Sequence, residues 1–117
     1  MPANELNLTI EQGATFENLL TFKDASQAVI DVTSWDIAGQ IRRTWDSPTI
    51  IETFTFTKAN QITNTGEVTM SLTDAETSAI LALERTTEFV YDVEATVSGK
   101  KYRVMQGIVF LRAEVTR

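Results

Sequence analysis

Two carboxylates in the last third of the chain have a spacing that could support catalysis. Asp92 and Glu94 are separated by one residue in a segment where apolar and polar residues alternate. On a strand their side chains would therefore share one face, about 7 Å apart. Paired carboxylates flank the scissile bond in glycoside hydrolases. The alternative is a solvated sheet face, on which these acids pair with Lys100, Lys101 or Arg103 of the next strand. We favour the solvated face and expect no enzyme activity.

The residue inventory excludes most other catalytic chemistry. The 117-residue chain contains no cysteine and no histidine. Disulfides, thiolate nucleophiles, the Ser-His-Asp triad and zinc catalysis are therefore excluded. The five glycines are scattered and form no phosphate-binding loop. The segment 24–28 has one acid and no glycine at its bend, unlike a calcium-binding EF-hand. We expect no metal and no cofactor.

Residues 42–45 have the character of protein-contact residues. Arg42 and Arg43 are adjacent, so on a strand one of them faces the interior side or an edge and requires a carboxylate partner. Alternatively they are interface anchors, because arginine is enriched at binding hot spots. Trp45 precedes a turn-forming Asp-Ser-Pro run, which predicts an exposed loop tryptophan that contacts a protein or a sugar. Trp35 lies on an apolar strand face and is expected in the core.

The elements that would position these residues are strands. Apolar and polar residues alternate with a period of two along most of the chain, and turn-forming clusters separate the alternating runs. The pattern predicts strands at about 5–10, 14–23, 29–32, 35–44, 49–57, 68–72, 89–97 and 102–110. The segment 29–32 is either a strand or the approach to one.

One segment changes to a helical period. Thr73, with Glu76 three residues later, forms a capping-box signature, and apolar residues follow at helical spacing in 79–83. This predicts one short helix at about 74–83. Seven or eight short strands whose buried faces carry large side chains favour an antiparallel sandwich over a barrel. At this length the chain is expected to form a single domain, residues 1–117.

Both ends of the chain suggest contact surfaces. Leu6, Leu8 and Ile10 alternate near the start, which predicts an arm that pairs with an exposed sheet edge of a neighbour by β-augmentation. The last strand is apolar on both faces. One face carries Val104, Ile108 and Phe110, and the other carries Val109, Leu111, Ala113 and Val115. This pattern predicts a strand covered by the core on one side and by the helix or a neighbouring subunit on the other.

Charge and hydropathy limit the classes of partner. The net charge is −6, from 16 acidic and 10 basic residues, and an acidic surface repels phosphate backbones. No apolar run approaches the roughly 18 residues of a membrane span, and the N-terminus has no signal-peptide pattern. We therefore expect no nucleic-acid or membrane partner. We expect the protein to be made in a cytosol and to stay there or to enter a particle assembled there.

Several short segments in a fixed order carry a resemblance over nearly the whole chain. They are residues 7–16 (NLTIEQGATF), 37–42 (IAGQIR), 72–77 (LTDAET), 91–94 (YDVE), 107–109 (GIV) and 114–117 (EVTR). In this order the chain resembles small virion structural proteins of tailed bacteriophages, including cyanophage types. It is also similar to the N-terminal domain of phage baseplate upper proteins, which continue into a long receptor-binding or linking region.

The resemblance implies an Ig-like β-sandwich that is not an enzyme and binds other virion structural proteins. The expected role is a baseplate or tail adaptor, a homo-oligomer within a virion assembled in the host cytoplasm. A capsid decoration (cement) protein is the alternative. A carbohydrate-binding module, with Trp45, Tyr91 or Tyr102 as its platform, is the alternative from another class. The candidate interface residues are Leu6, Leu8, Ile10, Arg42, Arg43 and Trp45.

Overall fold

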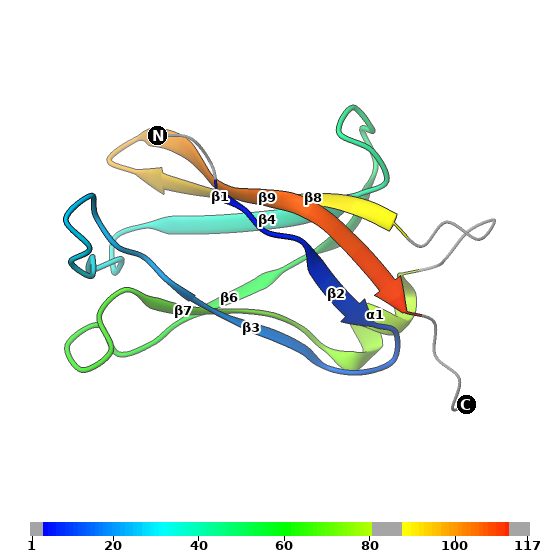
Figure 1. The fold of residues 1–117 in the computed structure, drawn as a ribbon, viewed down its shortest axis with the longest axis horizontal. Helices are drawn as coiled ribbons and strands as arrows, with labels where there is room; N and C mark the ends of the chain where they lie inside the picture. The colour runs from blue at the N-terminus through cyan, green and yellow to red at the C-terminus, as the bar shows by residue number, and fades with distance from the viewer. Residues whose placement is uncertain (1–3, 81–87, 113–117) are drawn as a thin grey trace.

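The strands pack as two layers in the computed structural model, which describes residues 4–80 and 88–112 (Figure 1). The large sheet has the order β1-β9-β8-β4-β5, with β2 also paired to β9, and the small sheet has the order β3-β7-β6. The large sheet contains β1 (Asn4–Glu5), β2 (Leu8–Glu11), β4 (Asp36–Arg42), β5 (Ile50–Thr53), β8 (Glu88–Val97) and β9 (Lys100–Arg112). The small sheet contains β3 (Phe16–Thr21), β6 (Thr55–Lys58) and β7 (Glu67–Leu72). The predicted all-β sandwich is confirmed, with nine strands in the part of the chain that the structure describes.

The β8–β9 hairpin forms the centre of the large sheet, as predicted. Its turn residues Ser98 and Gly99 both have positive φ, 51° and 80°. Two such residues give the hairpin connection whose twist matches that of the flanking strands. Val93 pairs with Met105 but Glu94 pairs with Arg103, so the register shifts by one residue within the hairpin.

The predicted strand 49–57 is divided between the two sheets. β5 pairs with β4 in the large sheet, whereas β6 pairs with β7 in the small sheet. Phe54 lies between them, and its N–H donates to the Gly39 carbonyl at 2.9 Å. A Cβ on Gly39 would lie 2.9 Å from the Asp92 carbonyl oxygen and 3.0 Å from the Phe56 ring. Glycine at position 39 therefore allows the crossing chain to approach β4 and β8.

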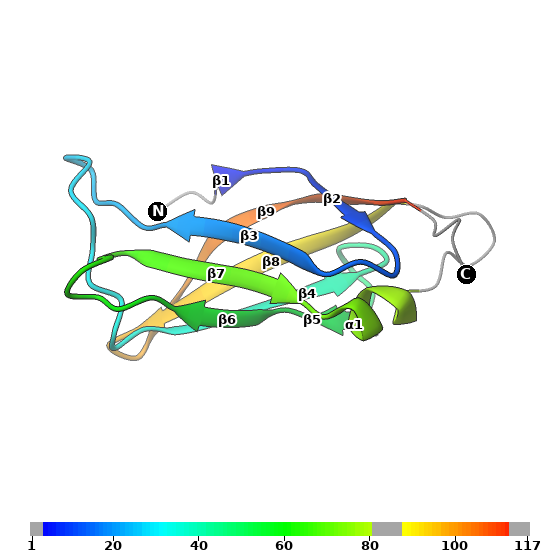
Figure 2. The same cartoon turned by 90° about the horizontal axis from the view of Figure 1, so that it is seen from below.

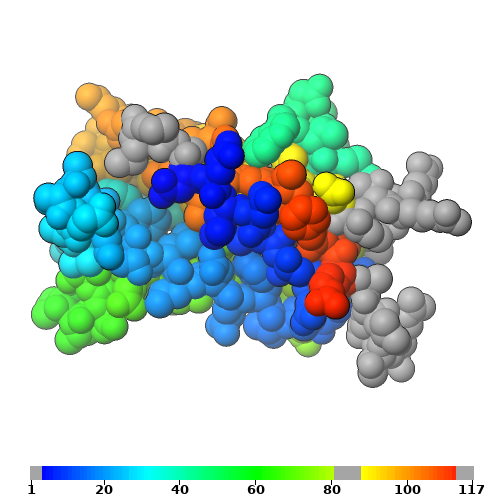
Figure 3. All heavy atoms as spheres, viewed as in Figure 1, coloured from blue at the N-terminus to red at the C-terminus, as the bar shows by residue number. Residues whose placement is uncertain are grey.

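The N-terminal segment forms two short strands instead of the single predicted one. Both β1 and β2 run parallel to β9, with Asn4 opposite Met105 and Leu8 opposite Val109. The prediction of a purely antiparallel sandwich is therefore wrong for this segment. In Figure 3 the atoms of the N-terminal strands lie against those of β9, at the margin of the large sheet.

The segment 29–32 is not a strand. Within it, only Val29 makes a β-bridge, to Lys23. Val32 is fully buried, and its N–H donates to the Gln61 side-chain oxygen at 3.2 Å. That amide oxygen also accepts from the Gly66 N–H at 2.8 Å. The segment is therefore held at its start by backbone bonds, since the Ile30 N–H donates to the Phe22 carbonyl at 3.0 Å, and at Val32 by the Gln61 side chain.

The predicted helix is present as α1 (Asp74–Ala79), and its capping box is confirmed. The Glu76 N–H donates to the Thr73 hydroxyl at 3.1 Å, and the Thr73 N–H donates to the Glu76 carboxylate at 2.8 Å. Thr77 is fully buried, and its hydroxyl accepts from the Gly13 N–H at 3.0 Å. This contact fixes α1 against the turn between β2 and β3. The predicted helix is too long at its end, because Ile80 is the C-cap of α1 and has extended backbone angles. The predicted helical positions 81–83, like the expected apolar positions 113 and 115, lie outside the described residues.

The core lies between the two sheets and is centred on aromatic rings. Phe54 is 4% exposed, and its ring centroid lies 6.0 Å from those of Phe16 and Tyr91 and 6.4 Å from that of Phe56. These separations are in the range of favourable edge-to-face and tilted aromatic contacts. Aliphatic side chains from both sheets and from the end of α1 surround the rings: Leu8, Ile10, Ile41, Met70, Leu72, Ile80, Val93, Val109 and Leu111.

Candidate interaction surfaces

A row of residues that is apolar except for Arg42 crosses the outer face of the large sheet. Arg42 lies between Ile50 of β5 and Val90 of β8, and Val90 pairs with Ile108 of β9. Ile50 is 44% exposed, and Phe110, two residues beyond Ile108, is 38% exposed. We call Ile50, Val90, Ile108 and Phe110 the outer row. Ile108 and Phe110 confirm that β9 is apolar on both faces, since Val109 and Leu111 point into the core. The placement of Val104 on the outer face with them is wrong, because Val104 packs against the core next to the register shift.

Trp45 stands in the loop between β4 and β5, beside this row. It is 57% exposed, which confirms the predicted exposed loop tryptophan. Beneath it is a small hollow of about 60 Å³, lined by Gln40, Arg42, Val90 and Asp92 among others. The indole therefore borders both apolar and polar groups of the large sheet.

Arg42 holds the loop that carries Trp45. Its guanidinium donates to the Ser47 carbonyl at 2.8 Å and to the Gln40 side-chain oxygen at 2.9 Å. The predicted carboxylate partner is wrong for Arg42, because two neutral oxygens, a carbonyl and a side-chain amide, accept the hydrogen bonds of its guanidinium. Within the loop, the Thr44 hydroxyl donates to Asp46 at 2.8 Å. Arg43 follows the end of β4, is half-buried, and is not among the residues that line the hollow.

The two carboxylates first considered for catalysis occupy the predicted solvated face. Arg103 lies 3.3 Å from the Asp92 carboxylate, and both side chains are partly exposed. Arg103 is also the register partner of Glu94. An exposed ion pair of this kind contributes at most about 1 kcal/mol to stability. The geometry favours the cross-strand pairing that we proposed over a pair of catalytic acids.

The N-terminal candidates separate into buried and exposed residues. Leu8 is 6% exposed and Ile10 is fully buried, both in the core. Their prediction as interface residues is wrong for this structure, because β2 already pairs with β9 of the same chain. Leu6 differs, since it is 44% exposed. It lies between β1 and β2, where its N–H donates to the Gln106 carbonyl at 2.9 Å.

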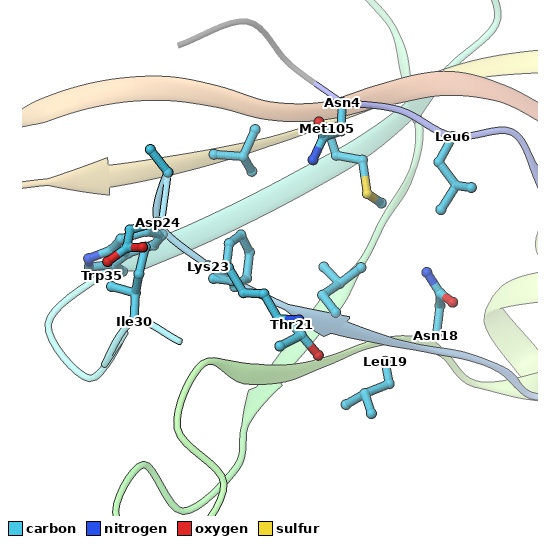
Figure 4. Close-up of a pocket in the computed structure, with 14 residues that line it drawn as sticks. Asn4, Leu6, Asn18, Leu19, Thr21, Lys23, Asp24, Ile30, Trp35 and Met105 are labelled. Atoms are coloured by element: carbon cyan, nitrogen blue, oxygen red, sulfur yellow. The ribbon is translucent and has the colours of Figure 1, made fainter. Parts of the chain in front are cut away.

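A groove opens between the sheets, where β1 and β9 face β3. It has a volume of about 460 Å³, and its lining includes Leu6, Leu20, Phe22, Trp35 and Met105. Figure 4 shows the Leu6 and Met105 side chains directed from the large sheet toward β3. The sequence analysis missed this groove, because its walls come from segments far apart in the chain.

The Asp24 carboxylate caps the turn in which it lies. It accepts from the Ser26 hydroxyl at 2.7 Å and from the Ala28 N–H at 3.0 Å. These hydrogen bonds, that of Ser26 above all, hold the pKa of Asp24 below its ordinary value. The segment 24–28 is therefore a turn capped by the Asp24 side chain.

Tyr91 crosses the large sheet from β8 to the N-terminal segment. It is 1% exposed, so its prediction as a sugar platform is wrong. Its hydroxyl donates to the Leu6 carbonyl at 2.5 Å. Burial raises the pKa of Tyr91 to about 12, because the charged phenolate is poorly solvated there.

The hydrogen bond of Tyr91 predicts a loss of stability at alkaline pH. Because the folded-state pKa is raised, the contribution of this phenol is complete below about pH 10, the unfolded value. It declines as the pH rises from about 10 to 12, because the unfolded state loses the proton first. We expect Tyr91→Phe to lower the free energy of unfolding by about 1 kcal/mol at pH 8, and this difference to shrink by pH 11.

Urea unfolding of both proteins at pH 8, 10 and 11 measures this difference. Tyr102→Phe is the matched control, because Tyr102 is 38% exposed, and it should follow the wild type at each pH. A deficit of Tyr91→Phe that stayed constant across the series would contradict the prediction.

Comparison with known proteins assigns no relative to the chain. No family model matches it, and no curated protein matches it. Among residues 4–80 and 88–112, no helix is long and apolar enough to cross a membrane. Over the same ranges, no cluster of three or more acidic, His or Cys side chains is placed to hold a metal ion. The resemblance to phage virion proteins stays a prediction.

Proposed function

We propose that this chain is a structural protein of a tailed-phage virion, assembled in the host cytoplasm as a baseplate or tail adaptor. It binds other virion structural proteins and further copies of itself, and it carries out no reaction. The virion assignment follows the sequence resemblance. The contact surface that we propose for other virion proteins is the outer row together with Trp45.

The observation that supports this surface is the way Trp45 is held. A tryptophan that is 57% exposed would be a weak anchor on a mobile loop, because binding would have to order it. Here the Arg42 guanidinium fixes the loop through the Ser47 carbonyl. Preorganised aromatic side chains beside apolar surface are typical of binding hot spots.

The size of the hollow beside Trp45 favours a protein over a sugar. Its volume of about 60 Å³ is well below the roughly 300 Å³ at which small-molecule sites begin. A carbohydrate-binding module remains the alternative, because Gln40, Arg42 and Asp92 present polar groups beside the indole. Binding to a glycan array that is lost in Trp45→Ala would favour that function.

The test of the proposed function is incorporation of Trp45→Ala into particles. A tryptophan hot spot contributes about 2 kcal/mol or more, which corresponds to roughly thirtyfold weaker binding. We therefore expect the variant to fold with an unchanged thermal midpoint but to be nearly absent from purified particles. Quantitative immunoblotting of those particles measures the loss, and immunogold labelling of the wild type distinguishes tail from capsid surface.

The matched control is Ile62→Ala, because Ile62 is 93% exposed in the separate loop between β6 and β7. It should enter particles like the wild type. Normal incorporation of Trp45→Ala would contradict the proposed contact surface, and absence of the wild-type chain from particles would contradict the virion assignment.

A further inference from the structure

β3 is an open edge of the small sheet. It spans six residues, and it pairs with β7 on one side only. Figure 2 shows β7 and β6 on one side of β3, and β1 and β2 of the other sheet beyond its free side. An edge strand presents unpaired backbone groups that can accept another strand, and proteins usually block such edges with charged residues (above all lysine), with proline or with a bulge. Residues 16–21 contain neither lysine nor proline, and their pairing with β7 has no register shift. Their one charged residue is Glu17, for which the register proposed below provides a lysine partner.

Two hydrogen bonds identify the backbone groups at the free edge. The Phe22 N–H donates to the Gly66 carbonyl at 2.8 Å, so residue 22 directs its backbone groups toward the β7 side. The Ala59 N–H donates to the Glu67 carbonyl at 3.0 Å, so residue 67 of β7 directs its backbone groups toward β6 and not toward β3. Backbone groups of successive residues alternate between the two edges of a strand. The even-numbered residues of β3 therefore bond to β7. Glu17, Leu19 and Thr21 direct their N–H and C=O groups to the open edge.

These three residues are self-complementary about Leu19. We propose that two copies of this chain pair through antiparallel β3 edges, with a twofold axis at Leu19. Leu19 then faces its own counterpart, and Glu17 faces Thr21 of the other copy in both directions. Each such pair can exchange two backbone hydrogen bonds, and the small sheets of two copies join into one.

The side chains on the outer face fit this register. Leu19 is 57% exposed in the middle of an otherwise polar face formed by Glu17, Thr21, Thr55, Thr57, Thr69 and Ser71. Pairing covers both copies of Leu19. It also places Glu17 diagonally across from Lys23 of the other copy, within reach of an ion pair. A register centred on Asn18 would instead bring the two Glu17 side chains diagonal to each other, which is unfavourable.

The groove beside β3 adds apolar surface to the same interface. Leu6 is 44% exposed at its wall, and the groove of each copy would open toward the partner once the β3 edges meet. On the inner face, Phe16 would lie opposite Phe22 and Asn18 opposite Leu20 of the other copy. Because strand pairing of this length buries a small area, we expect a dissociation constant roughly between 1 µM and 1 mM.

The other edges of the described sheets suit this role less. Along β9, the edge consists of two separate short strands, β1 with two residues and β2 with four, and β5 at the opposite edge has four. β6 also has four and ends in Lys58, the kind of charged residue that blocks edge pairing. This inference takes from the proposed function only that copies of the chain associate, and it requires no virion partner.

A single cysteine tests the register, since the chain has none of its own. In the proposed dimer two Leu19→Cys residues face each other at a Cα separation of about 5.5 Å, within the range of a disulfide. The matched control is Thr21→Cys, whose two copies lie four residues apart along the pair, about 14 Å. Under mild oxidation at 0.1–1 mM protein (on the order of the expected dissociation constant), Leu19→Cys should form a covalent dimer and Thr21→Cys should not.

Sedimentation of the cysteine-free proteins supplies the second measurement. The wild type should be in concentration-dependent monomer–dimer exchange, and Leu19→Lys should weaken the dimer at least tenfold by placing two ammonium groups at the axis. Ile62→Lys adds the same charge elsewhere and should dimerise like the wild type, as should Trp45→Ala. Equal cross-linking of both cysteine variants, no cross-linking of Leu19→Cys, or equal effects of the two lysines would overturn the proposal. A folded wild type that stays monomeric at 1 mM would overturn it too.

Discussion

Replacing Phe54 by alanine is expected to lower the free energy of unfolding by about 3–5 kcal/mol, the usual loss for a buried phenylalanine. The side chain is 4% exposed, so its removal leaves a cavity between the two sheets. Its ring also contacts those of Phe16, Phe56 and Tyr91, and each such aromatic pair contributes about 0.5–1.5 kcal/mol beyond burial. Urea unfolding followed by tryptophan fluorescence measures the change.

The control for this substitution is Phe110→Ala. Phe110 is 38% exposed on the outer row, so the same atoms are removed from a site that is already partly hydrated. We expect a loss of about 1 kcal/mol or less. If the two variants were equally destabilised, the position of Phe54 at the centre of the aromatic cluster would be wrong.

Phe54 also shows why the sequence could not predict the division of its strand. Apolar and polar residues alternate strictly only from Thr53 to Thr57, since Ile50 and Ile51 are both apolar and Glu52 is polar. The sequence predicts one strand across this break, because a break in the period can mark a bulge as well as a change of sheet. What separates β5 from β6 is the approach of Phe54 to Gly39, a contact between segments distant in sequence. The pattern predicted extended chain correctly, but its break at residues 50–52 did not specify which strands the two halves would pair with.

The same limit applies to strand partners. Alternation of Leu6, Leu8 and Ile10 predicted an extended N-terminal segment, which the structure contains as β1 and β2. Its parallel pairing with β9 depends on the order of strands in the sheet, which local periodicity does not specify. Leu8 and Ile10 were therefore assigned to a surface, although they lie in the core.

The candidate surfaces divide along similar lines. Exposure of Trp45 could be predicted, because the turn-forming residues after it are local. The part played by Arg42 could not be, since its partner is the carbonyl of Ser47 and any residue type offers a carbonyl. The open edge of β3 was missed for a further reason. Whether a strand lies at an edge depends on the order of the strands in the sheet, which the sequence pattern does not give.

Replacing Gly107 by alanine is expected to detach the N-terminal segment from β9. A Cβ at this position would lie 2.1 Å from the Leu6 carbonyl oxygen and 2.8 Å from its carbon, so backbone has to move. The shift would break the Tyr91 hydroxyl bond to Leu6 and the bond from the Ile108 N–H to the Asn7 side chain, at 3.0 Å. We expect the free energy of unfolding to fall by about 3 kcal/mol, from the overpacking and the two lost bonds together.

The matched control is Gly99→Ala, which adds the same methyl group in the β8–β9 turn. Nothing lies within 4 Å of that position, but its φ of +80° is unfavourable for alanine, so a loss of about 1 kcal/mol is expected. Amide hydrogen exchange separates the two effects, because only Gly107→Ala should speed the exchange of Leu6 and Ile108.

A second test uses Tyr91→Phe: if Gly107→Ala has already broken the hydroxyl bond, adding Tyr91→Phe should cost almost nothing further. Full additivity of the two substitutions would mean that Leu6 keeps its place despite the added methyl group, and the close approach at Gly107 would then not be what holds the N-terminal segment.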